Sequence, residues 1–68
     1  MVGTNIKEAR RKRGWTQVQL AHAIGHQGGE AASAAISKIE SGQRDPRAST
    51  LDRVAKALGI KVMDLLRE

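Results

Sequence analysis

The 68-residue chain contains no cysteine, no phenylalanine and no tyrosine, and it has one proline and one tryptophan. Without cysteine it can form neither a disulfide nor a thiolate metal site, so its stability must come from helix packing and self-association. A single aromatic residue argues against a stacking platform for single-stranded nucleic acid. No apolar run approaches the roughly 18 residues of a membrane span, and no signal peptide opens the chain. We therefore expect a cytoplasmic protein that does not enter a membrane.

The chain is short and strongly basic. Lysine and arginine number 12 and aspartate and glutamate number 7, which gives a net charge of +5. A chain of this length forms one small domain, here residues 1–68. A basic excess of this size favours a polyanionic partner, most often nucleic acid, although an ordinary solvated surface would give the same composition.

The stretch from Thr16 to Gly42 predicts two short helices separated by a glycine-marked turn. Thr16 can cap the first helix, with Gln19 at the third position of a capping box, and Gly25 can end it. The second helix has apolar residues on one face and small or polar residues on the other. Two capped helices, a short turn and a smooth outer face on a basic chain indicate a helix-turn-helix. Its second helix would enter the major groove of DNA.

Three further helices are predicted around this unit. After a loose end at residues 1–3, Thr4 or Asn5 can cap the first helix. Ser49 can cap the fourth helix, with Asp52 at the capping-box position. No segment shows the alternation of a strand, so we expect an all-α, compact five-helix bundle. The expected helices cover about residues 5–13, 17–24, 30–40, 50–58 and 62–67.

Four segments of the chain follow one linked pattern. They are A-R-R-K-R-G-W-T-Q-V-Q-L-A at 9–21, I-G at 24–25, I-S-K-I-E-S-G-Q-R-D-P at 36–46 and L-D-R-V-A-K-A-L-G-I at 51–60. With this pattern the chain resembles the phage repressor/Cro-type helix-turn-helix family, the XRE-like DNA-binding domains. The resemblance implies a lambda-repressor-like fold. It also implies a sequence-specific transcriptional regulator of double-stranded DNA, a repressor by our interpretation, from a prokaryote or a phage.

Arg10 and Glu40 are the first pair to interpret in this pattern. The resemblance implies an ion pair between the first helix and the end of the recognition helix. Both residues lie on helix faces that otherwise turn inward, and a bidentate guanidinium–carboxylate pair satisfies both groups. We therefore interpret Arg10 as structural and not as a DNA contact, and we expect the loss of either partner to cost about 3–5 kcal/mol.

Four other side chains are expected to contact the DNA backbone. Gln17 stands at the first turn of the second helix, where the family meets the backbone and where a helix N-terminus favours phosphate. Gln43, Arg44 and Arg47 follow the recognition helix, in the loop with which the family touches phosphates. Arg47 could also reach the minor groove. The alternative is that these side chains are simply solvated.

The segment between Gly25 and Ile36 departs from the family pattern. It is about five residues longer than usual, and His26 replaces an apolar residue. Either the turn is enlarged, or the recognition helix begins earlier and is longer. Glutamine can pair with adenine, glutamate with the cytosine amino group, and alanine with the thymine methyl group, although the alanines also fit helix propensity and tight packing alone. The expected base-reading residues are Gln27, Glu30, Ala31, Ser33, Ala34, Ser37 and Lys38.

Other chemistry has little support in the sequence. His22, His26 and Glu30 have the spacing of a metal site on a helix, but three glycines interrupt that helix, so we expect no metal. No catalytic triad, carboxylate dyad or phosphate loop stands out, and the interior of so small a chain leaves no room for a substrate pocket. We therefore expect neither an enzyme nor a cofactor.

The expected partner is a palindromic DNA operator bound by a homodimer. Dimers of this class place two recognition helices about 34 Å apart, one turn of B-DNA. The terminal helix holds more apolar residues than such a helix usually buries, so we expect a two-fold interface through it and the loop before the fourth helix. The expected residues of this dimer interface are Val62, Met63, Leu65 and Leu66.

The alternative function is an antitoxin that neutralises a partner protein and autoregulates its operon.

Overall fold

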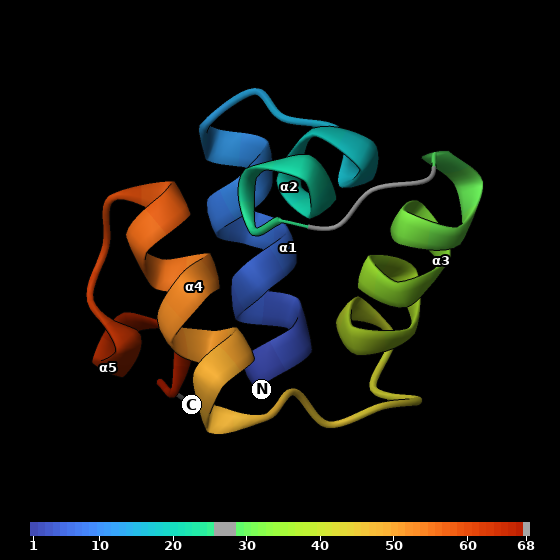
Figure 1. Ribbon diagram of the computed structural model, residues 1–68. Coiled ribbons are helices and arrows are strands. Elements are labelled where there is room, and N and C mark those ends of the chain that lie inside the picture. Colours follow the sequence, from blue (N-terminus) through green and yellow to red (C-terminus); the bar gives the residue numbers. More distant parts are fainter. Residues whose placement is uncertain (26–28, 68) are drawn as a thin grey trace.

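The computed structural model describes residues 1–25 and 29–67, apart from the side chains of residues 29–31 (Figure 1). This part of the chain is all-helical and compact, which confirms the expected fold class. Its elements are α1 (Val2–Lys12), α2 (Gln17–Ala23), α3 (Gly29–Glu40), α4 (Ala48–Leu58) and α5 (Val62–Leu65).

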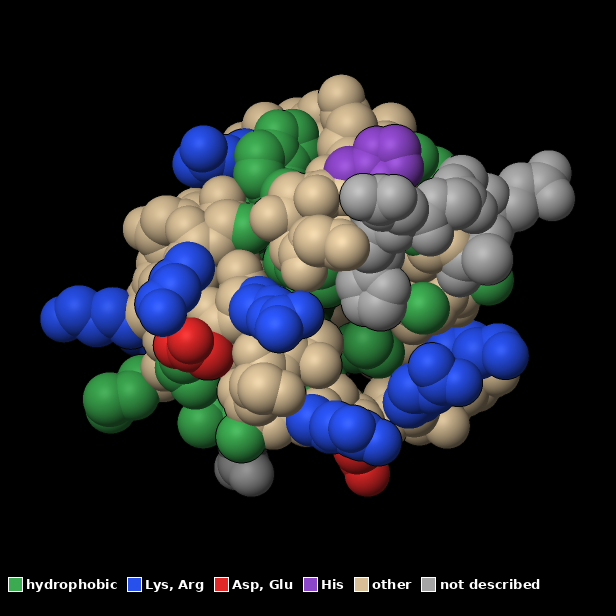
Figure 2. Space-filling model, viewed as in Figure 1, with side chains coloured by type: hydrophobic (Ala, Val, Ile, Leu, Met, Phe, Trp, Pro, Cys, Tyr) green, Lys and Arg blue, Asp and Glu red, His purple; other side chains and the backbone are tan. Residues whose placement is uncertain are grey.

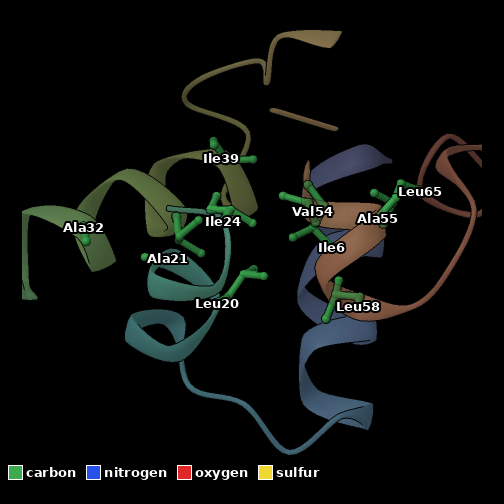
Figure 3. Close-up of a cluster of buried hydrophobic side chains, with 11 residues drawn as sticks. Ile6, Leu20, Ala21, Ile24, Ala32, Ile39, Val54, Ala55, Leu58 and Leu65 are labelled. Atoms are coloured by element: carbon green, nitrogen blue, oxygen red, sulfur yellow. The ribbon is translucent and has the colours of Figure 1, made fainter. Parts of the chain in front are cut away.

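The buried core lies where the first four helices meet, and α5 adds one side chain to it (Figure 3). The amphipathic stripe of α4 and the inward face of α3 supply most of its aliphatic side chains, as their helical spacing predicts. Trp15, Leu51 and Ile60 pack against its margin. The buried apolar residues are Ile6, Leu20, Ala21, Ile24, Ala32, Ile36, Ile39, Val54, Ala55, Leu58 and Leu65.

Helix α1 begins at Val2, three residues before its predicted start, and no side chain caps it. Val2 packs against the core, and Gly3 lies so close to the end of α3 that a Cβ there would collide with the carbonyl oxygens of Ile39 and Glu40. The first residues are therefore part of the helix, and the prediction of a loose end was wrong. Contact with α3, which is distant in sequence, fixes the start of α1.

The predicted capping box opens α2. Oγ1 of Thr16 accepts a hydrogen bond from the Gln19 N–H at 3.1 Å, and Oε1 of Gln19 accepts one from the Thr16 N–H at 2.7 Å. Two backbone donors at the helix start are thereby satisfied by side chains. Gly25 follows the helix with a φ of 94°, a left-handed conformation that glycine adopts without strain.

Helix α3 spans 12 residues, from Gly29 to Glu40. Of the two alternatives for the long segment before Ile36, this length agrees with a recognition helix that begins early. Residues 26–28, with His26 and Gln27, lie outside the described residues.

Helix α4 begins at Ala48, two residues earlier than expected, and its cap is different. Arg47 occupies the N-cap position in an extended conformation, without a side-chain capping bond, and Ser49 lies inside the first turn. The Leu51 N–H donates to the Arg47 carbonyl at 2.9 Å and closes that turn. The predicted Ser49–Asp52 capping box was therefore wrong, because the hydrogen-bond ladder starts two residues before Ser49.

Helix α5 is a single turn that ends at Leu65 and does not continue to residue 67. Asn5 of α1 accounts for this end, because its Nδ2 donates to the carbonyl oxygens of Leu65, at 3.0 Å, and of Arg67. These bonds hold the last residues against α1 and bring the two ends of the chain close together (Figure 1).

Candidate nucleic-acid interface

A buried polar network fixes the two helices of the helix-turn-helix to α1. Arg10 donates from Nε to Oε2 of Glu40 at 2.7 Å and from Nη2 to Oε1 at 3.1 Å. Its Nη1 donates to the Trp15 carbonyl at 2.7 Å. Arg10 and Glu40 are 8% and 9% exposed, so both charges are satisfied inside the protein. The expected ion pair is thus present, and it joins α1, the following turn and the end of α3.

Gln17 belongs to the same network. Its Nε2 donates to Oε1 of Glu40 at 3.1 Å, and the residue is half-buried. An amide group carries two N–H donors, so one remains, together with the backbone N–H of this first residue of α2. The expected phosphate contact of Gln17 would use these donors and stays a prediction.

The exposed face of α3 carries small and basic side chains. Ala34, Ser37 and Lys38 are exposed, and Ser33 is half-buried. Successive residues of an α-helix are about 100° apart around its axis. Starting from Glu40, which faces α1, the next exposed positions around α3 are therefore Ser37, then Ala34, then Lys38. The side chains of Glu30 and Ala31 and the whole of Gln27 lie outside the described residues.

The turn after α3 folds back onto the end of that helix. The backbone N–H groups of Gln43 and Arg44 donate to the Lys38 carbonyl at 2.9 and 3.2 Å, and the Ser41 hydroxyl donates to the same carbonyl at 3.2 Å. Gln43, Arg44 and Arg47 are all exposed. Figure 2 shows Lys and Arg side chains gathered beside the lower end of α3 and the segment that follows it. This cationic surface continues to the uncapped start of α4.

Arg13 makes one cation–π contact and one hydrogen bond that were not expected from the sequence. The guanidinium of Arg13 lies over the Trp15 ring, 4.8 Å from its centroid, and its Nη1 donates to the Leu58 carbonyl at 3.5 Å. These contacts link the end of α1 to α4. The close approach at Gly3 was also missed, because a glycine near the start of a chain has no local signature of packing.

A surface depression of about 530 Å³ lies between α1, α4 and α5. The sequence suggested only that the interior leaves no room for a pocket, and this depression lies at the surface. Its polar lining carries both charge signs, with Glu8 and Asp64 beside Lys12, Arg13 and Arg67.

The expected dimer interface needs one correction. Leu65 is fully buried against the core, so it is not available to a second copy, and its inclusion was wrong. A single-turn helix held to α1 by Asn5 must turn one apolar side chain inward. Met63 and Leu66 are 76% and 50% exposed, and Val62 is partly buried against the core.

The described part of the chain shows neither a metal site nor a membrane span. It contains no group of three His, Cys, Asp or Glu residues that could hold a metal ion. His26 of the His22–His26–Glu30 pattern lies outside it. None of its helices is long and apolar enough to cross a membrane.

The helical bundle, the exposed outer face of α3 and the cationic turn after it are the features of a helix-turn-helix DNA-binding domain. A helix-turn-helix family model matches residues 6–65, from the first turns of α1 to the end of α5. The chain belongs to the XRE-like helix-turn-helix family, whose members are DNA-binding transcription regulators. No curated protein and no solved structure matches it.

Proposed function

We propose that this protein is a repressor that binds a specific duplex DNA site with α3 in the major groove. The observation that carries the proposal is the exposed face of α3, where Ala34 and Ser37 are small and Lys38 adds a positive charge. The major groove is about 12 Å wide and admits an α-helix, and small side chains let the helix backbone approach the base edges. Repression by occupancy of a promoter requires no further surface.

Base reading falls to α3 and the residues just before it. Ser37 and Lys38 can hydrogen-bond to base edges, and Ala34 can contact a thymine methyl group. The set also includes Ser33, which is half-buried on the α1 side of this face. Three further members of the proposed reading set precede these residues: Gln27, Glu30 and Ala31.

Phosphate binding falls to the turn after α3 and the start of α4. Arg44 and Arg47 are exposed guanidinium groups, and Gln43 adds an amide beside them. The first N–H groups of α4 have no side-chain cap, and such groups favour an anion. Gln17 would complete these contacts from the α2 side. Backbone contacts of this kind position a protein on DNA without reading its sequence.

The proposed binding unit is a homodimer on a palindromic operator. Met63 and Leu66 supply exposed apolar surface at α5, with the partly buried Val62 next to them. A two-fold dimer would bury this surface and present two copies of α3 one helical turn of DNA apart. The alternative is an antitoxin that neutralises a toxin, and co-purification of such a partner would favour it.

Selection of bound duplexes from a random library tests this function. We expect an enriched palindrome, and we expect its binding to weaken with salt at a log–log slope of about −4 to −5 if the contacts from Gln17 and the turn after α3 neutralise four to six phosphates per dimer. The Arg44→Ala and Arg47→Ala variants should lose affinity for the palindrome and for random DNA by similar factors. Lys38→Ala should alter the selected sequence instead. A library without enrichment, or a slope near zero, would refute the proposal.

A further inference from the structure

Helix α1 carries more positively charged side chains than its ion pairs within the described structure account for. Residues 7–13 read K-E-A-R-R-K-R, five cations and one acid. Arg10 is paired with Glu40, but Lys7 and Arg11 are exposed and form no ion pair with any described residue. They stand four residues apart, where two like charges on a helix destabilise it. Arg11 stands in the last turn of α1, where a cation is favoured, but the local fold gives no reason for placing Lys7 one turn before it.

Lys7 lies along the seam between α1 and α3. Gly3 approaches the last carbonyls of α3, and Arg10 reaches Glu40 at the end of the same helix. Lys7 is four residues after Gly3 and three before Arg10, so it shares their side of α1. Its exposure places it on the solvent edge of the seam. Arg11 stands one turn further along this edge.

The cations of the turn after α3 lie on the opposite side of that helix. Glu40 faces α1, and Lys38, two residues away, points about 160° from it around the axis. The Arg44 N–H bonds to the Lys38 carbonyl and holds the turn at this end of α3. The exposed positions Ser37 and Ala34 lie between these two directions. The exposed face of α3 therefore has cations on both borders, with Lys7 and Arg11 on the α1 side and Lys38 and Arg44 on the other.

We propose that Lys7 and Arg11 form a second phosphate-binding border. Two DNA strands flank the major groove, and Lys7 and Arg11 bind one of them while Arg44 and Arg47 bind the other. A helix inserted in that groove has a phosphate backbone on each side. Lys7 and Arg11 are about 6 Å apart along α1. Phosphates of one strand follow every 3.4 Å or so along the duplex axis, so this separation corresponds to about two nucleotides of one strand. The inference rests on the proposed insertion of α3.

The salt dependence of duplex binding tests this border. The probe is a mixed-sequence duplex of about 40 base pairs, with affinity measured by fluorescence anisotropy from about 50 to 300 mM KCl. Lys7→Gln/Arg11→Gln should make the log–log slope shallower by about 2 per bound protomer, because each lost phosphate contact removes about 0.9.

Lys12→Gln/Arg67→Gln is the matched control, with the same loss of charge. Both residues are exposed and line the depression between α1, α4 and α5. Lys12 points about 160° from Arg10 around α1, away from the seam. We expect this variant to keep most of the slope. An unchanged slope in the Lys7/Arg11 variant, or an equal change in the control, would overturn the inference.

An Arg44→Gln/Arg47→Gln variant separates the inference from the proposed function. If only this variant makes the slope shallower, the second border is wrong and insertion of α3 stands. If the unaltered protein has a slope near zero, both fall. Should the Lys7/Arg11 double variant melt at a lower temperature, Lys7→Gln and Arg11→Gln measured singly should each give about half of the change in slope.

Discussion

Replacement of Glu40 by glutamine should unfold the protein at a much lower temperature before it changes the choice of DNA site. The Glu40 carboxylate accepts three hydrogen bonds, two from Arg10 and one from Gln17, and its side chain is 3% exposed. Glutamine has one acceptor oxygen and no charge, so the Arg10 guanidinium would remain buried without a counter-ion. Breaking such a pair costs about 3–5 kcal/mol.

This loss is large for so small a domain. At about 4–8 °C for each kcal/mol, the melting temperature of Glu40→Gln should fall by roughly 12 °C or more, measured by circular dichroism. Arg10→Met should behave alike. The Arg10→Met/Glu40→Met double variant should recover part of the loss, because two apolar side chains leave no unpaired charge.

Asp52→Asn is the control for the size of the fall in melting temperature. It removes the ion pair between Asp52 and Lys56, which are 53% and 77% exposed, and such surface pairs contribute about 0–1 kcal/mol. Its melting temperature should therefore change by only a few degrees. If Glu40→Gln melts like Asp52→Asn, or keeps its melting temperature and loses only DNA binding, the network acts at the DNA and the structural interpretation is wrong.

Three further changes test contacts that the sequence did not reveal or did not place. Gly3→Ala should destabilise the fold by about 1–3 kcal/mol, because the new methyl group forces α1 away from α3, whereas Thr4→Ala on the exposed side should not. Asn5→Ala should release the end of the chain, seen as faster proteolysis after α5 at an almost unchanged melting temperature. Leu66→Glu should weaken dimerisation and operator affinity together in sedimentation equilibrium, and unchanged operator affinity would count against the α5 interface.

Features with a local chemical cause could be read from the sequence. Thr16 and Gln19 stand three residues apart and satisfy one another, so the start of α2 needed no information from the rest of the fold. The stripe of α4 needed only the helical period. The pairing of Arg10 with Glu40 was implied by the family resemblance, and the inward faces on which both stand agree with it.

Features fixed by distant contacts could not be read in this way. Helix α1 already includes Gly3 because Gly3 fits against the end of α3, which lies 36 residues along the chain at Ile39. Leu65 and Leu66 are identical side chains in sequence, and only the attachment of α5 to α1 decides that the first is buried and the second exposed. The family pattern located the end of α3, but nothing in the pattern fixed its start at Gly29.

The start of α4 shows where a local rule of helix capping fails. Ser49 and Asp52 have the spacing of a capping box, and a good N-cap contributes about 1 kcal/mol. The structure instead places the exposed Arg47 at the N-cap, so the first N–H groups of α4 stay open to solvent. A departure from local consistency of this kind is typical of binding sites. In the proposed complex a DNA phosphate would take the place of the missing cap, with Arg44 and Arg47 beside it, so the stability given up in the free protein is regained on DNA.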